Sequence, residues 1–198
     1  MPITHLPSFQ DPVQDAQQTF RALLDALARP GIPQSTTTIT APAGLTTSCA
    51  ASCLTLLDLE TSVWLQPGTP EAAKSWLLIH TGCRFTDQPQ TADFALIGDI
   101  ETMPRLDQFS WGVADYPEAS TSLLIQLPSL QGQHPVTLKG PGILGAITLQ
   151  SCLNGDFWHQ WQDMTDQYPL GLDAWCFAGN QAVGLPRTAR IVSDQGKS

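Results

Sequence analysis

Positive charge is scarce in this 198-residue sequence, which has 9 Lys and Arg against 18 Asp and Glu and a formal net charge of -9. Because the chain contains no run of Lys or Arg, it lacks the series of cations that a nucleic-acid-binding surface needs along the phosphate backbone. Charged residues make up only 14% of the chain, against a usual share of about 25%. A surface so poor in charge favours contact with another subunit.

Long apolar runs are also missing. No stretch approaches the roughly 18 apolar residues that a membrane-spanning helix needs. The first residues, Met1 to His5, show no basic region followed by an apolar one. We therefore expect a cytoplasmic protein without membrane contact.

The cysteines form neither a disulfide framework nor a metal-binding pattern. Their number, five, is odd, and reduced thiols fit best in a chain without a visible signal peptide. Cys49 and Cys53 are four residues apart, but a zinc site would need two further ligands at close spacing. We expect buried cysteines that act as small hydrophobic residues, and no metal site.

The clearest expected element is a helix that begins at Asp11-Pro12, a typical N-cap followed by proline. Further helices are expected over residues 46–57, 70–80 and 154–167, and strands over 34–40, 62–65, 94–97, 123–127, 136–138, 172–178 and 182–185. Helices and strands alternate early and strands gather late. This order predicts the α/β fold class, with a mixed sheet and flanking helices. We expect a single domain, 1–198, ending in a flexible tail, 192–198.

Arg29, Arg84, Lys139 and Arg187 are among the cations that lie within two residues of a glycine or a proline, where backbone N–H groups at the end of an element can point at the same anion. The predicted anion-binding candidates are Arg187, Thr188, Lys139, Gly140, Gly142, Arg29 and Arg84. Arg187 with Thr188 is the best of them, because a guanidinium offers paired donors and the hydroxyl adds a third. The alternatives are solvated cations in turns and, for Arg187, a pairing with a carboxylate. No catalytic residue can be assigned.

Several other motif matches lack the sequence context that their function requires. Gly140 to Gly145 matches the dinucleotide fingerprint G-x-G-x-x-G, but Pro141 lacks an N–H, and β-branched residues stand where a long helix should follow. Lys139 is the only plausible lysine for a pyridoxal phosphate Schiff base, and we expect no such chemistry and no cofactor. His80 and Cys83 are too close in sequence for a typical nucleophile and base, and Trp158 and Trp161 are expected in the core.

Seven segments, read in order, resemble the PhnH family, whose members are subunits of carbon–phosphorus lyase. The segments are FRALLDALARPG (20–31), LTLLD (54–58) with TSVWL (61–65), HTGC (80–83), PEAST (117–121), GPGI (140–143), YPLGLD (168–173) and LPRT (185–188). The resemblance covers residues 12–191. Lys139 and Ala189 depart from it, since the family pattern has threonine at both positions.

The resemblance implies a fold similar to the large domain of pyridoxal-phosphate-dependent transferases, without the cofactor. It also implies a homodimer when the chain is isolated, and an assembly with the PhnG, PhnI and PhnJ subunits in which a phosphonate displaces adenine from ATP. The product would be a ribose 1-phosphonate 5-triphosphate, which a separate iron–sulfur subunit cleaves later.

The net charge of -9 opposes a polyphosphate at long range. The hypothesis is therefore a structural and site-completing subunit whose partner supplies most of the catalytic groups. The alternatives are a self-sufficient small-molecule enzyme at a dimer cleft and a pure scaffold.

Overall fold

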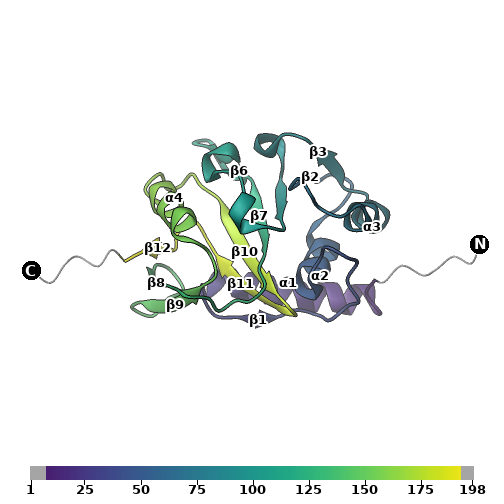
Figure 1. Ribbon diagram of the computed structural model, residues 1–198, viewed down its shortest axis with the longest axis horizontal. Helices are drawn as coiled ribbons and strands as arrows, with labels where there is room; N and C mark the ends of the chain where they lie inside the picture. The colour runs from purple at the N-terminus through teal and green to yellow at the C-terminus, as the bar shows by residue number, and fades with distance from the viewer. Residues whose placement is uncertain (1–7, 193–198) are drawn as a thin grey trace, which may run out of the picture.

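The computed structural model describes residues 8–192, which form an α/β fold around a seven-stranded mixed sheet (Figure 1). In spatial order the strands are β1 (Gln34–Ser35), β11 (Gln181–Leu185), β10 (Asp173–Ala178), β7 (Ser122–Gln126), β4 (Phe94–Ile97), β2 (Ser62–Leu65) and β3 (Arg84–Thr86). The strands from β10 to β3 are parallel, whereas β11 is antiparallel to both of its neighbours. The α/β class with a mixed sheet is thus confirmed.

Two smaller sheets stand beside the large one. A three-stranded sheet is formed by β12 (Arg190–Ile191), β8 (His134–Lys139) and β9 (Ile147–Ser151), and a two-stranded hairpin by β5 (Trp111–Val113) and β6 (Tyr116–Ser120). Three short 3-10 helices, η1 (Pro89–Thr91), η2 (Ile100–Thr102) and η3 (Leu106–Gln108), lie in the connections.

Side-chain caps mark where three of the four α-helices of the described residues begin. The four helices are α1 (Pro12–Ala28), α2 (Thr47–Leu56), α3 (Glu71–Thr81) and α4 (Gly155–Thr165). Asp11 Oδ1 accepts hydrogen bonds from two backbone N–H groups at the start of α1, and Asn154 Oδ1 accepts one at the start of α4. Such bonds satisfy N–H groups that have no partner within the helix. None of the described helices is both long and apolar enough to cross a membrane.

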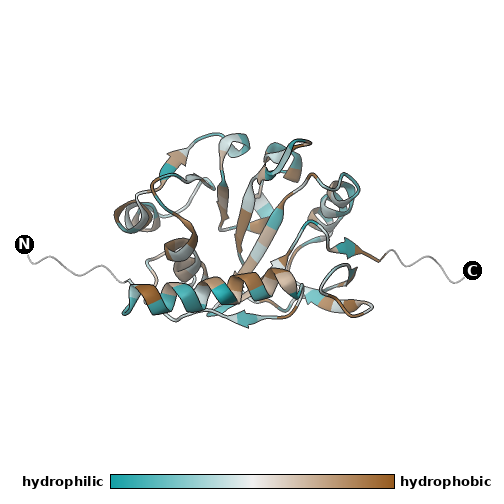
Figure 2. Cartoon of the chain, turned by 180° about the vertical axis from the view of Figure 1, so that it is seen from behind, coloured by the Kyte–Doolittle hydropathy of each residue, from teal (hydrophilic) through white to brown (hydrophobic). Residues whose placement is uncertain are grey.

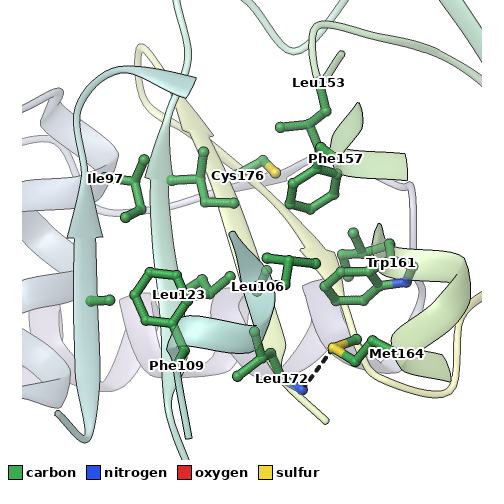
Figure 3. Packing of buried hydrophobic residues seen from close by; sticks show 14 of the residues in the cluster. Ile97, Leu106, Phe109, Leu123, Leu153, Phe157, Trp161, Met164, Leu172 and Cys176 are labelled. Atoms are coloured by element: carbon green, nitrogen blue, oxygen red, sulfur yellow. Dashed lines mark hydrogen bonds between the residues drawn. The ribbon is translucent and has the colours of Figure 1, made fainter. Parts of the chain in front are cut away.

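Each central strand sends alternate side chains to two hydrophobic clusters, one on each face of the sheet. In β7, Leu123 and Ile125 join the cluster beneath α4, whereas Leu124 joins the cluster beneath α1, α2 and α3. Figure 3 shows the first cluster, where Phe157 and Trp161 of α4 face the sheet. Both faces are covered, which explains why the central strands read as continuous apolar runs.

All four expected helices and most expected strands are confirmed, with ends that differ by about two residues or fewer at most boundaries. The strand expected over 34–40 ends at Ser35, so the prediction is wrong for residues 36–40. Its partner strand begins at Gln181, which pairs with Ser35, so later residues have no strand to pair with. Thr37 instead donates its hydroxyl to the carbonyl oxygen of Asp15 on α1. Of the expected tail, residues 193–198 lie outside the described part of the chain, and Val192 N–H bonds to Thr137 O.

Candidate functional site

A crevice of about 660 Å³ lies beyond the carboxyl ends of the parallel strands. Gln66 follows β2, Gly98 follows β4, and Gln126 ends β7, and all three line the crevice. In the strand order, the connection from β2 leads to β3 at one edge of the sheet. The connection from β4 leads to β7, in the direction of the opposite edge. The boundary between β2 and β4 is therefore a topological switch point, the place where open α/β sheets bind ligands.

Gln66, which is only 4% exposed, holds one wall of the crevice in place. Its Oε1 accepts hydrogen bonds from the N–H groups of Gly98 and Asp99, both at 2.8 Å. Its Nε2 donates to Asp99 O at 2.8 Å and to Thr102 Oγ1 at 3.1 Å. The amide thus ties the end of β2 to the loop after β4.

Gln126 plays the same part on the opposite wall. Its Oε1 accepts from Thr46 N–H at 2.7 Å, and its Nε2 donates to Gly44 O at 3.0 Å. Thr46 in turn caps α2 by accepting a hydrogen bond from Cys49 N–H. Because buried amides fix both walls, the crevice is preorganised.

The crevice is polar but almost without charge. The N-termini of α2 and α3 point partial positive charge toward its edge, at Thr46 and Pro70. Asp99 is the one ionisable residue among the described residues that line it. Its carboxylate accepts hydrogen bonds from Glu101 N–H and Thr102 Oγ1, both at 3.0 Å. The crevice can therefore offer dipoles to a ligand, but no full positive charge and no acid–base pair.

Six of the seven predicted anion-binding residues come together on the far side of the molecule from β3. A Cβ on Gly140 would collide with the carbonyl oxygen of Thr188, and one on Gly142 with that of Ala28, beside Arg29. Lys139 on β8 lies opposite Arg190 on β12 in the antiparallel pairing of the two strands. Arg84 is separate, at the β3 edge, where it donates to Glu60 O. None of the seven lines the crevice.

Arg187 has acceptors for all five of its guanidinium N–H groups. Nε and Nη2 donate to Asp173 Oδ2 at 3.1 and 2.6 Å, and Nη2 also donates to Ser120 Oγ at 2.6 Å. Nη1 donates to the carbonyl oxygens of Pro117 and Pro169 at 2.8 and 3.3 Å. The carboxylate pairing that stood as the alternative is thus present, and the guanidinium joins β10 to β6 and to the loop after α4. Anion binding by Arg187 stays a prediction.

The cations around Arg187 are more open. Lys139 is exposed at the end of β8, and Arg29 is half-exposed in an ion pair with Asp25 at 2.7 Å. The loop at Gly142 can lie close to the end of α1 only because this residue has no side chain. Its φ of +81° favours glycine, and a Cβ there would collide with Ala28 O. These residues could meet an anion only at the surface, where water screens the attraction.

The remaining sequence candidates do not form a nucleophilic site. His80 packs against Trp76 with ring centroids 4.8 Å apart, and burial lowers the pKa of His80. Burial raises the pKa of the Cys83 thiol, which keeps it protonated near neutral pH. Cys49 and Cys53 are fully buried on α2, and Trp158 and Trp161 are in the core, as predicted.

Little in the sequence indicates the crevice. Leu65-Gln66-Pro67-Gly68 reads as a strand that runs into a turn, and nothing local shows that Gln66 is buried. The one signal available is a polar residue at the end of a buried strand: Gln66 directly follows β2, and Gln126 is the last residue of β7.

The comparisons with known proteins agree with one another. Residues 7–192 match the family described as bacterial phosphonate metabolism protein (PhnH). A protein of Rhizobium meliloti (strain 1021), named alpha-D-ribose 1-methylphosphonate 5-triphosphate synthase subunit PhnH, is 36% identical over 187 residues, which is 93% of this chain and 94% of that protein. A protein of Stutzerimonas stutzeri, named putative C-P lyase subunit protein HtxG, is 30% identical over 107 residues, which is 52% of each chain.

Proposed function

Because the chain belongs to the PhnH family of bacterial phosphonate metabolism proteins, we propose that it is a subunit of the carbon–phosphorus lyase core complex in phosphonate catabolism. In that complex it supports the displacement of adenine from ATP by a phosphonate, which gives ribose 1-phosphonate 5-triphosphate. Its partners there are PhnG, PhnI and PhnJ. The family resemblance also implies a cytoplasmic chain with a sheet like that of the pyridoxal-phosphate-dependent transferases. The mixed sheet and the five free thiols support this part of the proposal.

The single observation that supports a dependent subunit is the charge of the crevice. Displacing adenine requires that the triphosphate be held, that a phosphonate oxygen be aimed at the sugar carbon, and that the leaving base be protonated. Asp99 would repel the anions, and the lining provides no cation to offset it. A partner must therefore supply the cations and the general acid, and this chain supplies a preorganised polar wall without cations. A self-sufficient enzyme lacks support from this geometry.

Filling the crevice tests whether it takes part in turnover. Gly98 lines the crevice, and a Cβ there would meet Gln66 Oε1 at 4.0 Å, so Gly98→Leu should fold without strain. We expect the reconstituted complex to release adenine from ATP and methylphosphonate about 10–100-fold more slowly with this variant. The matched control is Gly155→Leu on α4, where a Cβ meets open space away from the crevice.

The same assay separates the alternatives. The isolated chain should release no adenine, and robust release by the chain alone would contradict the proposed function. If the Gly98→Leu complex assembles and turns over at the wild-type rate, the chain is a scaffold. The internal satisfaction of the Gln66 and Gln126 amides favours that second candidate.

We also propose that the isolated chain forms its homodimer across the outer face of α1. Val13, Phe20 and Leu24 are 75%, 45% and 52% exposed, and their spacing of seven and four positions places them on one face of the helix. Figure 2 views α1 from outside, with hydrophobic and hydrophilic segments alternating along it. Arg21 and Asp25 on the same helix have opposite charges, so a two-fold copy can pair them. Leu24→Lys should convert the dimer to a monomer in light-scattering measurements, whereas Leu59→Lys, at a leucine that is 74% exposed elsewhere, should not. An unchanged mass for Leu24→Lys would exclude this face.

A further inference from the structure

The only two tyrosines of the chain are exposed, and each stands next to a proline that is hydrogen-bonded to the same partly buried arginine, Arg187. Tyr116 and Tyr168 are 62% and 57% exposed. Each precedes a proline, and the carbonyl oxygens of Pro117 and Pro169 both accept from Nη1 of Arg187, at 2.8 and 3.3 Å. One guanidinium thus holds together two segments that are 52 positions apart in the sequence, and each segment carries an exposed tyrosine.

The hairpin that bears Tyr116 is fixed at its base. Trp111 Nε1 donates to Leu106 O at 2.8 Å, and Trp111 O accepts from Gly171 N–H at 3.0 Å. Ser120 Oγ accepts from Arg187 at 2.6 Å. In the described part of the chain, no third strand extends this hairpin. It is a preorganised projection, so a partner that binds it loses little affinity to ordering.

The surroundings of the tyrosines are acidic and partly apolar. Val113 on the hairpin is 57% exposed. In the sequence it follows Trp111 by two positions and precedes the exposed residues Asp115 and Glu118. Asp166 is exposed two residues before Tyr168. The segments 111–120 and 163–171 contain no Lys or Arg. We call Val113, Tyr116 and Tyr168, with their rim of Asp115, Glu118 and Asp166, the tyrosine surface.

We propose that the tyrosine surface docks this chain onto another subunit of the assembly, at a site where Lys and Arg surround an apolar seat. The inference rests on the proposed function, because it takes the partner from that assembly. Exposed tyrosines are frequent energetic centres of protein interfaces, and carboxylates around them favour a basic partner. A second copy of this chain is a poor occupant, since two-fold symmetry would place this acidic rim close to its own copy.

The test titrates the full-length chain onto the complex of the remaining carbon–phosphorus lyase subunits and measures the Kd. The double variant Tyr116→Ala/Tyr168→Ala should bind about 100-fold more weakly or worse. Asp115→Lys/Glu118→Lys should slow association and reduce the salt dependence of binding. The control is Leu59→Ala/Leu78→Ala, which removes two exposed leucines elsewhere and should leave the Kd unchanged.

Each outcome is distinct. If the wild-type chain does not bind the other subunits, the proposed function fails. If it binds and the tyrosine variant binds equally well, the function stands and the docking surface is wrong. A tyrosine variant that changes its own mass from dimer to monomer, with unchanged affinity for the other subunits, would assign the surface to a second copy instead. If the tyrosine variant unfolds, Asp115→Lys/Glu118→Lys tests the docking surface by itself: unchanged association and salt dependence would show that the surface is wrong.

Discussion

Arg187→Ala is expected to lower the free energy of unfolding by about 3–5 kcal/mol. The guanidinium is 13% exposed, and its partner Asp173 is 26% exposed. Removing the side chain leaves Asp173 Oδ2 and the carbonyl oxygens of Pro117 and Pro169 without their guanidinium donor in a largely buried site, while Asp173 Oδ1 keeps its bond from the backbone N–H of residue 187. Urea unfolding followed by tryptophan fluorescence measures the change, and Arg187→Lys should recover only part of it because lysine cannot make the same forked contacts.

The control for this prediction is another Arg–Asp pair that is open to solvent. Arg105 and Asp107 are 60% and 55% exposed at 3.3 Å, so Arg105→Ala should change stability by about 0.2–1 kcal/mol. If Arg187→Ala proves as mild as Arg105→Ala, the guanidinium does not hold β6, β10 and the loop after α4 together.

The role of Arg187 also determines how anion binding can be tested. Loss of turnover in Arg187→Ala would follow from the displaced hairpin and would say nothing about phosphate contact. Lys139 is exposed on the same side of the molecule as Arg187, and its side chain makes no hydrogen bond or ion pair within the described residues. Lys139→Ala is therefore the cleaner variant for the anion hypothesis.

The sequence predicted the features that depend on local interactions. Asp11-Pro12 and the apolar spacing after it fix α1 from within 17 residues. The central strands were visible because burial on both faces requires continuous apolar residues, as in Leu123 to Ile125. The hairpin β5–β6 was missed because Val113 and Tyr116 face solvent and its short strands follow no apolar pattern.

The features that position the sites depend on partners far away in the sequence. Arg187 reaches Pro117 across 70 positions and Ser120 across 67, and Gln126 reaches Gly44 across 82. Sequence reasoning identified the residue types that hydrogen-bond well, but only the fold decides whether Arg187 meets an external anion or Asp173. The net charge of -9 is read directly from the composition and predicted a dependent subunit, whereas the crevice without cations could be found only in the structure.

Trp161→Ala is expected to destabilise the protein by about 3–5 kcal/mol. The side chain is fully buried and stacks on Phe157 with ring centroids 5.6 Å apart. Its Nε1 donates to Ala189 O at 2.9 Å, which anchors the turn after Arg187 (Figure 3 shows the ring). The substitution leaves a cavity beneath α4 and a buried carbonyl oxygen without its donor. Calorimetric or urea-induced unfolding measures the loss.

Two phenylalanine variants separate the hydrogen bond from the packing. Trp161→Phe keeps most of the ring contacts but leaves Ala189 O without its hydrogen-bond donor, which should lower the free energy of unfolding by about 1–3 kcal/mol. Trp158 lies on the same helix and is 8% exposed, and its buried Nε1 has no hydrogen-bond partner among the described residues. Trp158→Phe removes an unsatisfied donor, so its loss of stability should be smaller, because only packing is lost. Equal losses for the two variants would show that the bond to Ala189 contributes nothing and that α4 is held by packing alone.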